Sequence, residues 1–367
     1  ARLLAESNRP DEAAELISKL VADEAARKRL EAVGQPIDAL LAERAWALAD
    51  AGKPAEADAA FEELLKSFPN SEHAADARFN LAESANQKKD YAEVARLLTP
   101  LVKPEAPNAP KTPDRLMSVV LYRLGRTQIE LGDWAAASST LDRLITEFPN
   151  DSHLREARLL RAEAALRRDQ FDAADADLAA LADAPASPDD PPDFVRIVAE
   201  RRLQSLLGLK RWKEALAQAD ALKDDKIDAP RDVVAFARGR ALLGLARPEE
   251  ARAAFQQVIE SHPGSDLAAQ AQLMRGETYF LEDRLREARM EFLKVDILYK
   301  SPRWQAAALL EAGKVEERLG QWAEAVETYD HLTTDFPEDP SAAEARKRRA
   351  AVVEQHKLKE ANRGDVK

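Results

Sequence analysis

Apolar residues recur along this chain at the spacing of an amphipathic helix, and regularly placed Gly and Pro residues interrupt the pattern. No stretch shows a convincing alternation of apolar and polar residues, which would indicate a β-strand. The pattern therefore predicts an all-α protein, built from many short helices that are joined by tight turns.

Three segments of the chain, 41–69, 121–149 and 309–337, share one arrangement of small, large and turn residues. In each, a small residue lies seven positions before a turn Gly, an Ala lies five after it, a large apolar residue nine after it and a Pro seventeen after it. In the middle segment these positions are Gly125, Gly132, Ala137, Leu141 and Pro149. Such a recurrence indicates a structural repeat.

The physical reason for this arrangement is the close crossing of two antiparallel helices. A close crossing needs a small side chain on each helix, and we expect Gly125 to meet Ala137 in this way. The large residue one turn later, Leu141, then fills the space beside the contact. Gly allows the tight turn, and Pro ends the second helix because it has no N–H to donate.

The pattern resembles the tetratricopeptide repeat, W-x2-L-G-x2-Y…A-x3-F…P. One match is Leu121-x2-Leu124-Gly125 followed by Ala137-x3-Leu141, and another is Gly276-x2-Tyr279 followed by Ala288-x3-Phe292. The resemblance implies a right-handed α-solenoid, a superhelix of antiparallel helix pairs whose first helices line the concave face. It also implies that the partner is a protein or peptide.

The small residue of the repeat recurs eight times along the chain, at spacings of 36 to 43 residues. The eight positions are Ala45, Ala82, Gly125, Ala162, Leu203, Gly239, Gly276 and Gly313, of which Leu203 departs from the small-residue rule, so we expect its repeat to be splayed or shifted. We therefore predict eight repeats within 38–340, with Pro-rich insertions near 100–113 and 185–192 at the two longest spacings. The other predicted segments are a partial repeat with a connecting helix at 1–37, a capping helix at 341–358 and a polar tail at 359–367.

Composition argues against nucleic-acid binding and against most kinds of active site. The chain of 367 residues has 66 acidic and 54 basic residues, a net charge of −12, whereas binding to a phosphate backbone requires clustered cations. It has no Cys, and its five His residues are not spaced as metal ligands. Neither a Gly-rich phosphate loop nor a G-x-S-x-G motif occurs. We therefore predict no enzyme activity, no cofactor and no metal.

The ends and junctions of the chain bear on its location. It begins without Met, at a stretch that reads like the end of a helix, so we expect a fragment or a processed product. The Phe68-Pro69 and Phe148-Pro149 junctions resemble those of bacterial envelope tetratricopeptide proteins, such as the coordinator associated with Tol–Pal and the lipoprotein of outer-membrane assembly. This resemblance implies a periplasmic or envelope-associated protein, with a cytoplasmic one as the alternative. Membrane association would then require a missing N-terminal segment or a partner.

The predicted partner-binding site lies on the first helices, at positions three before and one and four after each small residue, together with their neighbours. The candidates are Phe79, Asn80, Glu83, Tyr122, Arg123, Arg126, Glu163, Arg167, Phe236 and Arg240. Tyr122 and Arg126 lie one turn apart and suit a binding hot spot. The alternative is that Tyr122 is inter-repeat core and that Arg126 pairs with Glu163. The chaperone-tail clamp of some family members is not supported, because Ala42, Trp46 and Val119 occupy three of its positions.

We therefore predict a scaffold that binds a protein or peptide segment on its concave face. Two alternatives stay open: a structural or oligomerising segment of a larger envelope assembly, and an accessory domain of an enzyme that lies upstream. The location of exposed apolar side chains distinguishes the peptide-binding scaffold from the structural segment. A patch in the groove favours peptide binding, and a patch elsewhere favours assembly.

Overall fold

The structure is a computed structural model that describes residues 9–34, 36–103, 112–188, 190–223 and 229–356. These residues form nineteen helices, and no strand occurs among them, so the all-α prediction is confirmed. The helices belong to two compact units, residues 1–177 and 178–367. The centre of the first predicted insertion, 104–111, and the predicted polar tail lie outside the described residues.

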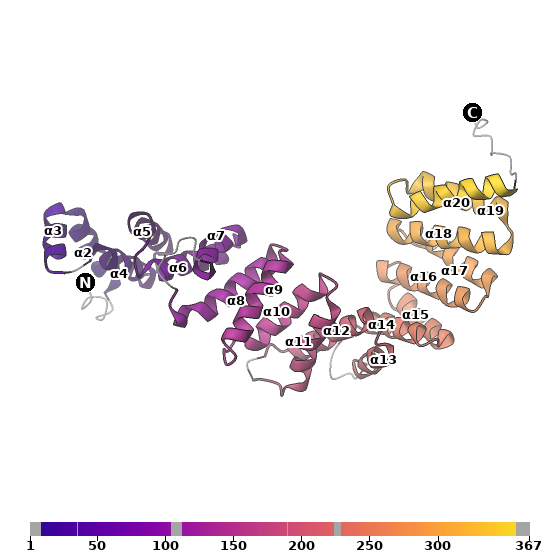
Figure 1. Ribbon diagram of the computed structural model, residues 1–367, viewed down its shortest axis with the longest axis horizontal. Helices are drawn as coiled ribbons and strands as arrows, with labels where there is room; N and C mark the ends of the chain where they lie inside the picture. Colours follow the sequence, from indigo (N-terminus) through magenta and orange to yellow (C-terminus); the bar gives the residue numbers. More distant parts are fainter. Residues whose placement is uncertain (1–8, 35, 104–111, 189, 224–228, 357–367) are drawn as a thin grey trace, which may run out of the picture. The chain divides into compact units, whose positions relative to one another are not determined.

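Unit 1 begins with two helices, of which α2 packs on α4, and continues as helix pairs (Figure 1). Its helices are α2 (Pro10–Ala22), α3 (Glu24–Ala32), α4 (Ile37–Asp50), α5 (Pro54–Ser67), α6 (Ala74–Gln87), α7 (Tyr91–Val102), α8 (Asp114–Glu130), α9 (Trp134–Glu147), α10 (Leu154–Leu166) and α11 (Phe171–Asp183), in which the division between the units falls. From α4 onward, each even-numbered helix is the first of a pair and the next helix is the second. The two helices pack against each other in the pairs α4–α5, α6–α7 and α8–α9.

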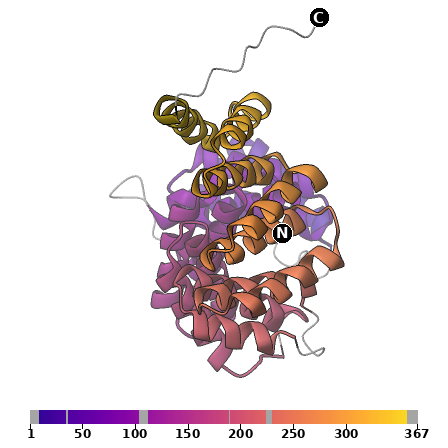
Figure 2. The same cartoon turned by 90° about the vertical axis from the view of Figure 1, so that its right-hand side faces the viewer.

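Unit 2 continues the alternation of first and second helices and ends on a single helix. Its helices are α12 (Phe194–Gly208), α13 (Trp212–Ala221), α14 (Arg231–Gly244), α15 (Pro248–Ser261), α16 (Asp266–Leu281), α17 (Leu285–Leu298), α18 (Pro302–Leu319), α19 (Trp322–Asp335) and α20 (Pro340–His356). The last three helices, coloured gold in Figure 2, pack on one another, with α20 against both α18 and α19. Its position lets α20 cover the end of the stack, and Arg349 of α20 holds Asp330 of α19 at 2.7 Å.

A residue with left-handed backbone lies in each of the eight turns between a first helix and its second helix. Three are glycines, and the other five are non-glycine residues with φ between 54° and 58°. The eight are Gly52, Lys89, Gly132, Asp169, Lys210, Ala246, Asp283 and Gly320. Each lies seven residues after one of the eight repeat positions, which hold a small residue everywhere except at Leu203. The turn geometry therefore recurs even where the Gly does not, at a conformational cost for the substituted residue.

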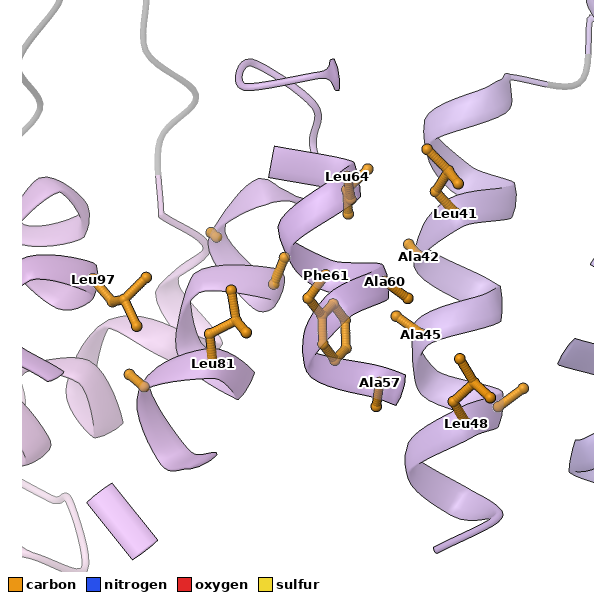
Figure 3. Close-up of a cluster of buried hydrophobic side chains, with 14 of the residues drawn as sticks. Leu41, Ala42, Ala45, Leu48, Ala57, Ala60, Phe61, Leu64, Leu81 and Leu97 are labelled. Atoms are coloured by element: carbon orange, nitrogen blue, oxygen red, sulfur yellow. The ribbon is translucent and has the colours of Figure 1, made fainter. Parts of the chain in front are cut away.

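The core of each pair lies where the small residue of the first helix meets the second helix. Figure 3 shows this in unit 1, where Ala42 and Ala45 of α4 face Ala60 of α5, and all three are fully buried. At the glycine versions of this position, the nearest contact is the large residue sixteen positions later. A Cβ atom on Gly125 would lie 2.6 Å from the Leu141 side chain. In the close crossing, the small residue of the first helix therefore faces the large residue of the second helix, such as Leu141. This contact adds to the predicted one with the Ala of the second helix, such as Ala137.

Candidate partner-binding face

The first helices of neighbouring pairs lie side by side in unit 1. Helix α8 packs against α10. Between α6 and α8, Arg115 holds both carboxylate oxygens of Asp76, at 2.7 and 2.8 Å. A second bridge joins Arg123 to Glu83, with Arg123 Nε 2.6 Å from Glu83 Oε1. We call the surface that carries Asn80, Glu83, Arg123, Arg126, Glu163 and Arg167 the first-helix face of unit 1.

The aromatic candidates are more buried than the sequence analysis expected. Tyr122 is 7% exposed and packs among Leu121, Leu141 and Leu144. Its ring stacks on His153, with ring centroids 4.2 Å apart. The prediction that Tyr122 projects into a groove is wrong, because its side chain fills the space between two repeats.

The other two aromatic candidates likewise belong to core clusters. Phe79 is partly buried against the core of unit 1. In unit 2, Phe236 is 8% exposed and packs near Phe255, with ring centroids 5.7 Å apart. Phe236 is therefore a packing residue rather than an exposed partner contact, which corrects its predicted role.

Polar contacts within the protein engage several of the charged and amide candidates. Asn80 donates from Nδ2 to the backbone oxygen of Asp76, 2.8 Å away in the same helix. Glu163 and Arg167 pair with each other at 3.0 Å, and the Arg167 guanidinium lies 5.5 Å from the ring centroid of Trp134. These contacts order the face, because each fixes the rotamer of a long side chain.

Arg126 is the least constrained of the three candidates on α8. Its Nη1 lies 3.4 Å from the Tyr122 hydroxyl and 3.6 Å from a Glu156 carboxylate oxygen, and its side chain is 49% exposed. The sequence left open that Arg126 pairs with Glu163. In the structure Arg126 instead makes a long contact with Glu156. Burial, followed by the hydrogen bond to Glu156, raises the pKa of Tyr122 to about 12, so the hydroxyl stays protonated at neutral pH.

A cavity of about 340 Å³ opens beside Arg126, between α8 and the turn that joins α6 to α7. Its size lies at the lower end of the range for ligand pockets. The residues that line it are Asn86, Gln87, Lys89, Tyr91, Arg123, Arg126, Thr127 and Glu130. The cavity therefore joins two predicted residues, Arg123 and Arg126, to polar groups contributed by a turn.

Lys89, Gln87 and Tyr91 line the cavity but were not among the binding residues predicted from the sequence. A signal for Lys89 was present, because it occupies the turn position that is Gly in the clearest repeats. A residue other than Gly at such a turn has a higher conformational energy in the left-handed region than Gly does. Tyr91 is the first residue of the second helix α7, and it is only partly buried.

The corresponding face of unit 2 carries charges of both signs. Arg240 of α14 is exposed, whereas Glu277 of α16 is partly buried. Burial and the nearby Glu311 carboxylate raise the pKa of Glu277 to about 7, and the charge of Arg240 opposes this shift. Lys314 lies 2.7 Å from Glu311 on α18. The candidate Arg240 and Glu277, which holds the equivalent position in the next repeat, thus affect each other electrostatically.

The chemistry available on these faces is charge pairing and hydrogen bonding. Within the described ranges, no group of three or more His, Asp or Glu side chains is placed to hold a metal ion. None of the helices in the same residues is long and apolar enough to cross a membrane. The arrangement can order and hold a flexible segment.

Comparisons with known protein families give a consistent description of the repeats. A family model described as tetratricopeptide repeat matches residues 43–109 and 236–296, and a second model with the same description matches residues 119–151 and 307–339. No curated protein sequence matches the chain.

Several solved structures are similar in fold at low sequence identity. The C-terminal part of a tetratricopeptide repeat-containing protein from Cytophaga hutchinsonii is 13% identical, with a TM-score of 0.48 over 73% of this chain and 98% of that one. The pilF protein of Pseudomonas aeruginosa is 16% identical, with a TM-score of 0.43 over 64% of this chain and 98% of that one. A tetratricopeptide repeat protein from Parabacteroides merdae is 13% identical, with a TM-score of 0.39 over 71% and 93%.

Proposed function

Because the chain belongs to the tetratricopeptide repeat family, we propose that it is a non-catalytic scaffold that binds a protein or peptide segment on the first-helix face of unit 1. Repeats of this kind present long surfaces built from neighbouring first helices, which suit extended partners. Membership of this family supports a role as a protein-interaction scaffold. The choice of face is our proposal.

The observation that carries the proposal is the cavity beside Arg126. It lies between two neighbouring pairs, and seven of its eight lining residues are exposed or partly exposed, whereas Thr127 is buried. Arg126 and Gln87 are exposed, and Asn86 is partly exposed. A side chain of the partner could therefore enter without displacing the buried residues that hold the pairs together.

The proposal can be tested with purified protein and a random library of ten-residue peptides that are acetylated and amidated at their ends. The protein is immobilised, bound peptides are sequenced, and affinities of the enriched peptides are measured by fluorescence polarisation. The double substitution Asn86→Ala, Arg126→Ala should weaken binding by about ten-fold or more, because it removes polar contacts at the centre of the proposed site.

A matched control is Arg96→Ala on α7. Its side chain is 65% exposed, pairs with Glu93 and does not line the cavity. Thermal unfolding of each variant establishes that it is folded. If the control and the double variant bind the enriched peptides equally well, the partner does not use this face. If no peptide is enriched by the folded protein, the proposed function itself fails.

A second candidate function is assembly, and one observation favours it. Three large apolar side chains of α17, Met290, Ile297 and Leu298, are 59%, 74% and 62% exposed. They lie seven and eight residues apart and therefore share one side of a helix. Exposed apolar surface away from the first helices fits a structural or oligomerising role. Concentration-dependent association in analytical ultracentrifugation that Ile297→Ser abolishes would support this function over peptide binding.

The remaining expectations stay predictions. We expect no binding to DNA or RNA at physiological salt, because the net charge is −12 and the basic side chains are dispersed. The periplasmic or envelope location, expected from the Phe-Pro junctions, likewise stays a prediction.

A further inference from the structure

The cavity beside Arg126 has an excess of positive charge, although the chain as a whole is acidic. Its lining has three cations, Lys89, Arg123 and Arg126, against one carboxylate, Glu130. Arg123 is neutralised by the bidentate pair with Glu83 on α6. Arg126 keeps only a long contact of 3.6 Å with Glu156, which is not part of the lining, so Lys89 and Arg126 share Glu130 as the one carboxylate of the cavity in a chain whose net charge is −12.

The ammonium group of Lys89 is available for a ligand. Among the described residues, the Lys89 ammonium has no hydrogen-bond or ion-pair partner, and the side chain is exposed. Its backbone is fixed in the turn, where Lys89 N donates to Asn86 O at 3.0 Å. The turn thus holds the base of the side chain at the cavity while the charged end stays free.

Arg126 has spare hydrogen-bonding capacity on the other side of the cavity. Its nearest acceptors are the Tyr122 hydroxyl at 3.4 Å and a Glu156 oxygen at 3.6 Å, both longer than the usual N–H···O distance. A guanidinium has five N–H donors, and its planar shape suits a carboxylate. Asn86 and Gln87 add amide donors in the same lining.

We propose that this cavity binds the side-chain carboxylate of an Asp or Glu within the partner segment, with Lys89 and Arg126 as its two cationic contacts. The proposal rests on the proposed function, because it names the group that the partner inserts. The available space, about 340 Å³, accommodates an acidic side chain together with ordered water. Glu130 at the same lining would repel a partner segment with several adjacent carboxylates, so one isolated acidic residue is expected.

The test uses the capped ten-residue library described above, in which no free C-terminal carboxylate exists, and a second library with free C-termini. Peptides enriched from the capped library should carry an Asp or Glu at one fixed position. Replacing that residue with Asn or Gln should weaken binding about ten-fold or more, and raising the salt concentration should weaken it further.

The diagnostic variant is Lys89→Gly. Gly adopts the left-handed backbone of this turn without strain, so the variant should remain folded while the ammonium is lost. We expect it to lower affinity for the acidic peptide about ten-fold and to leave affinity for the Gln version unchanged. The matched control is Lys88→Gln, which removes the same charge one residue away, where the side chain pairs with Asp58 at 3.1 Å outside the cavity.

The outcomes separate this inference from the proposed function. Enriched peptides without an acidic preference, or with a preference that Lys89→Gly leaves intact, would overturn the carboxylate site while peptide binding stands. Enrichment only from the library with free C-termini would overturn it too, because the ligand would then be a terminal carboxylate. A folded protein that enriches nothing from either library would overturn both proposals.

Discussion

Arg123 of α8 holds both carboxylate oxygens of Glu83 on α6: its Nε lies 2.6 Å from Oε1 and its Nη2 lies 2.8 Å from Oε2. Both side chains are partly buried, at 21% and 32% exposure, so solvent screens this pair less than a surface pair. The bridge joins the first helices of two neighbouring repeats, and it therefore sets the relative position of α6 and α8 at the edge of the proposed site.

The first prediction follows from this bridge. In a double-mutant cycle with Arg123→Gln and Glu83→Gln, we expect a coupling energy of about 1 kcal/mol in the free energy of unfolding, because partial burial of both side chains leaves their charge attraction less screened by solvent. Urea denaturation provides the measurement. The same cycle on the exposed pair Arg96 and Glu93 serves as the control and should give less than about 0.5 kcal/mol. Equal coupling in the two cycles would contradict the structural role of Arg123.

The second prediction concerns Tyr122. Tyr122→Ala should lower the free energy of unfolding by about 3–5 kcal/mol, because it leaves a cavity between Leu141 and Leu144 and removes the stack on His153. Tyr122→Phe keeps the ring and should lose less than about 1.5 kcal/mol. Arg126→Ala removes a half-exposed side chain and should stay within about 1 kcal/mol of the wild type. A Tyr122→Ala protein with unchanged thermal stability would show that this side chain is not core.

The third prediction concerns the left-handed turns. Ala246 has φ 56°, a conformation that Gly adopts without strain, so Ala246→Gly should raise the free energy of unfolding by about 0.5–1 kcal/mol. Gly132 has φ 74°, and a Cβ atom there would meet nothing within 4 Å. Gly132→Ala should therefore lower stability by about 1 kcal/mol through backbone strain alone. Urea denaturation of the two variants should give shifts of opposite sign, and shifts of the same sign would argue against the turn assignment.

The fourth prediction concerns pH and Glu277. Burial and the Glu311 carboxylate raise the pKa of Glu277 from 4.5 to about 7 in the folded protein. Between these two values the folded state keeps a proton that the unfolded state loses, so the contribution of Glu277 to stability falls as pH rises from 4.5 to 7. Glu277→Gln removes this dependence. Its stability relative to the wild type should therefore increase with pH over this range, by on the order of 1 kcal/mol after solvent screening.

Two further variants check the cause of the Glu277 shift. Glu311→Gln should bring the pKa of Glu277 closer to 4.5, because a repelling charge is removed. Arg240→Gln should raise it, because an attracting charge is removed. The stability of each variant is followed by urea denaturation across the same pH range. A difference between Glu277→Gln and wild type that does not change with pH would rule out the predicted titration.

Much of the fold could be predicted from the sequence, because the repeat depends on neighbouring elements. The small residue, the turn and the large residue lie within about one repeat of one another, so their spacing is visible along the chain. Gly125 and Leu141 illustrate this, since their contact follows from the crossing of two consecutive helices. The five left-handed turns without Gly were less visible, because the surrounding helices impose the conformation on Lys89, Asp169, Lys210, Ala246 and Asp283.

The sequence by itself determined the all-α repeat architecture and the positions of its first helices, because both follow from local periodicity and from the steric needs of a helix crossing. Only the tertiary structure decided which first-helix side chains remain exposed. Tyr122 is buried by a neighbouring repeat, and Arg123 is neutralised by Glu83 forty residues away, whereas Lys89 remains free at a cavity that two repeats form together. Burial and charge pairing depend on residues from other repeats, and periodicity within one repeat contains no information about them.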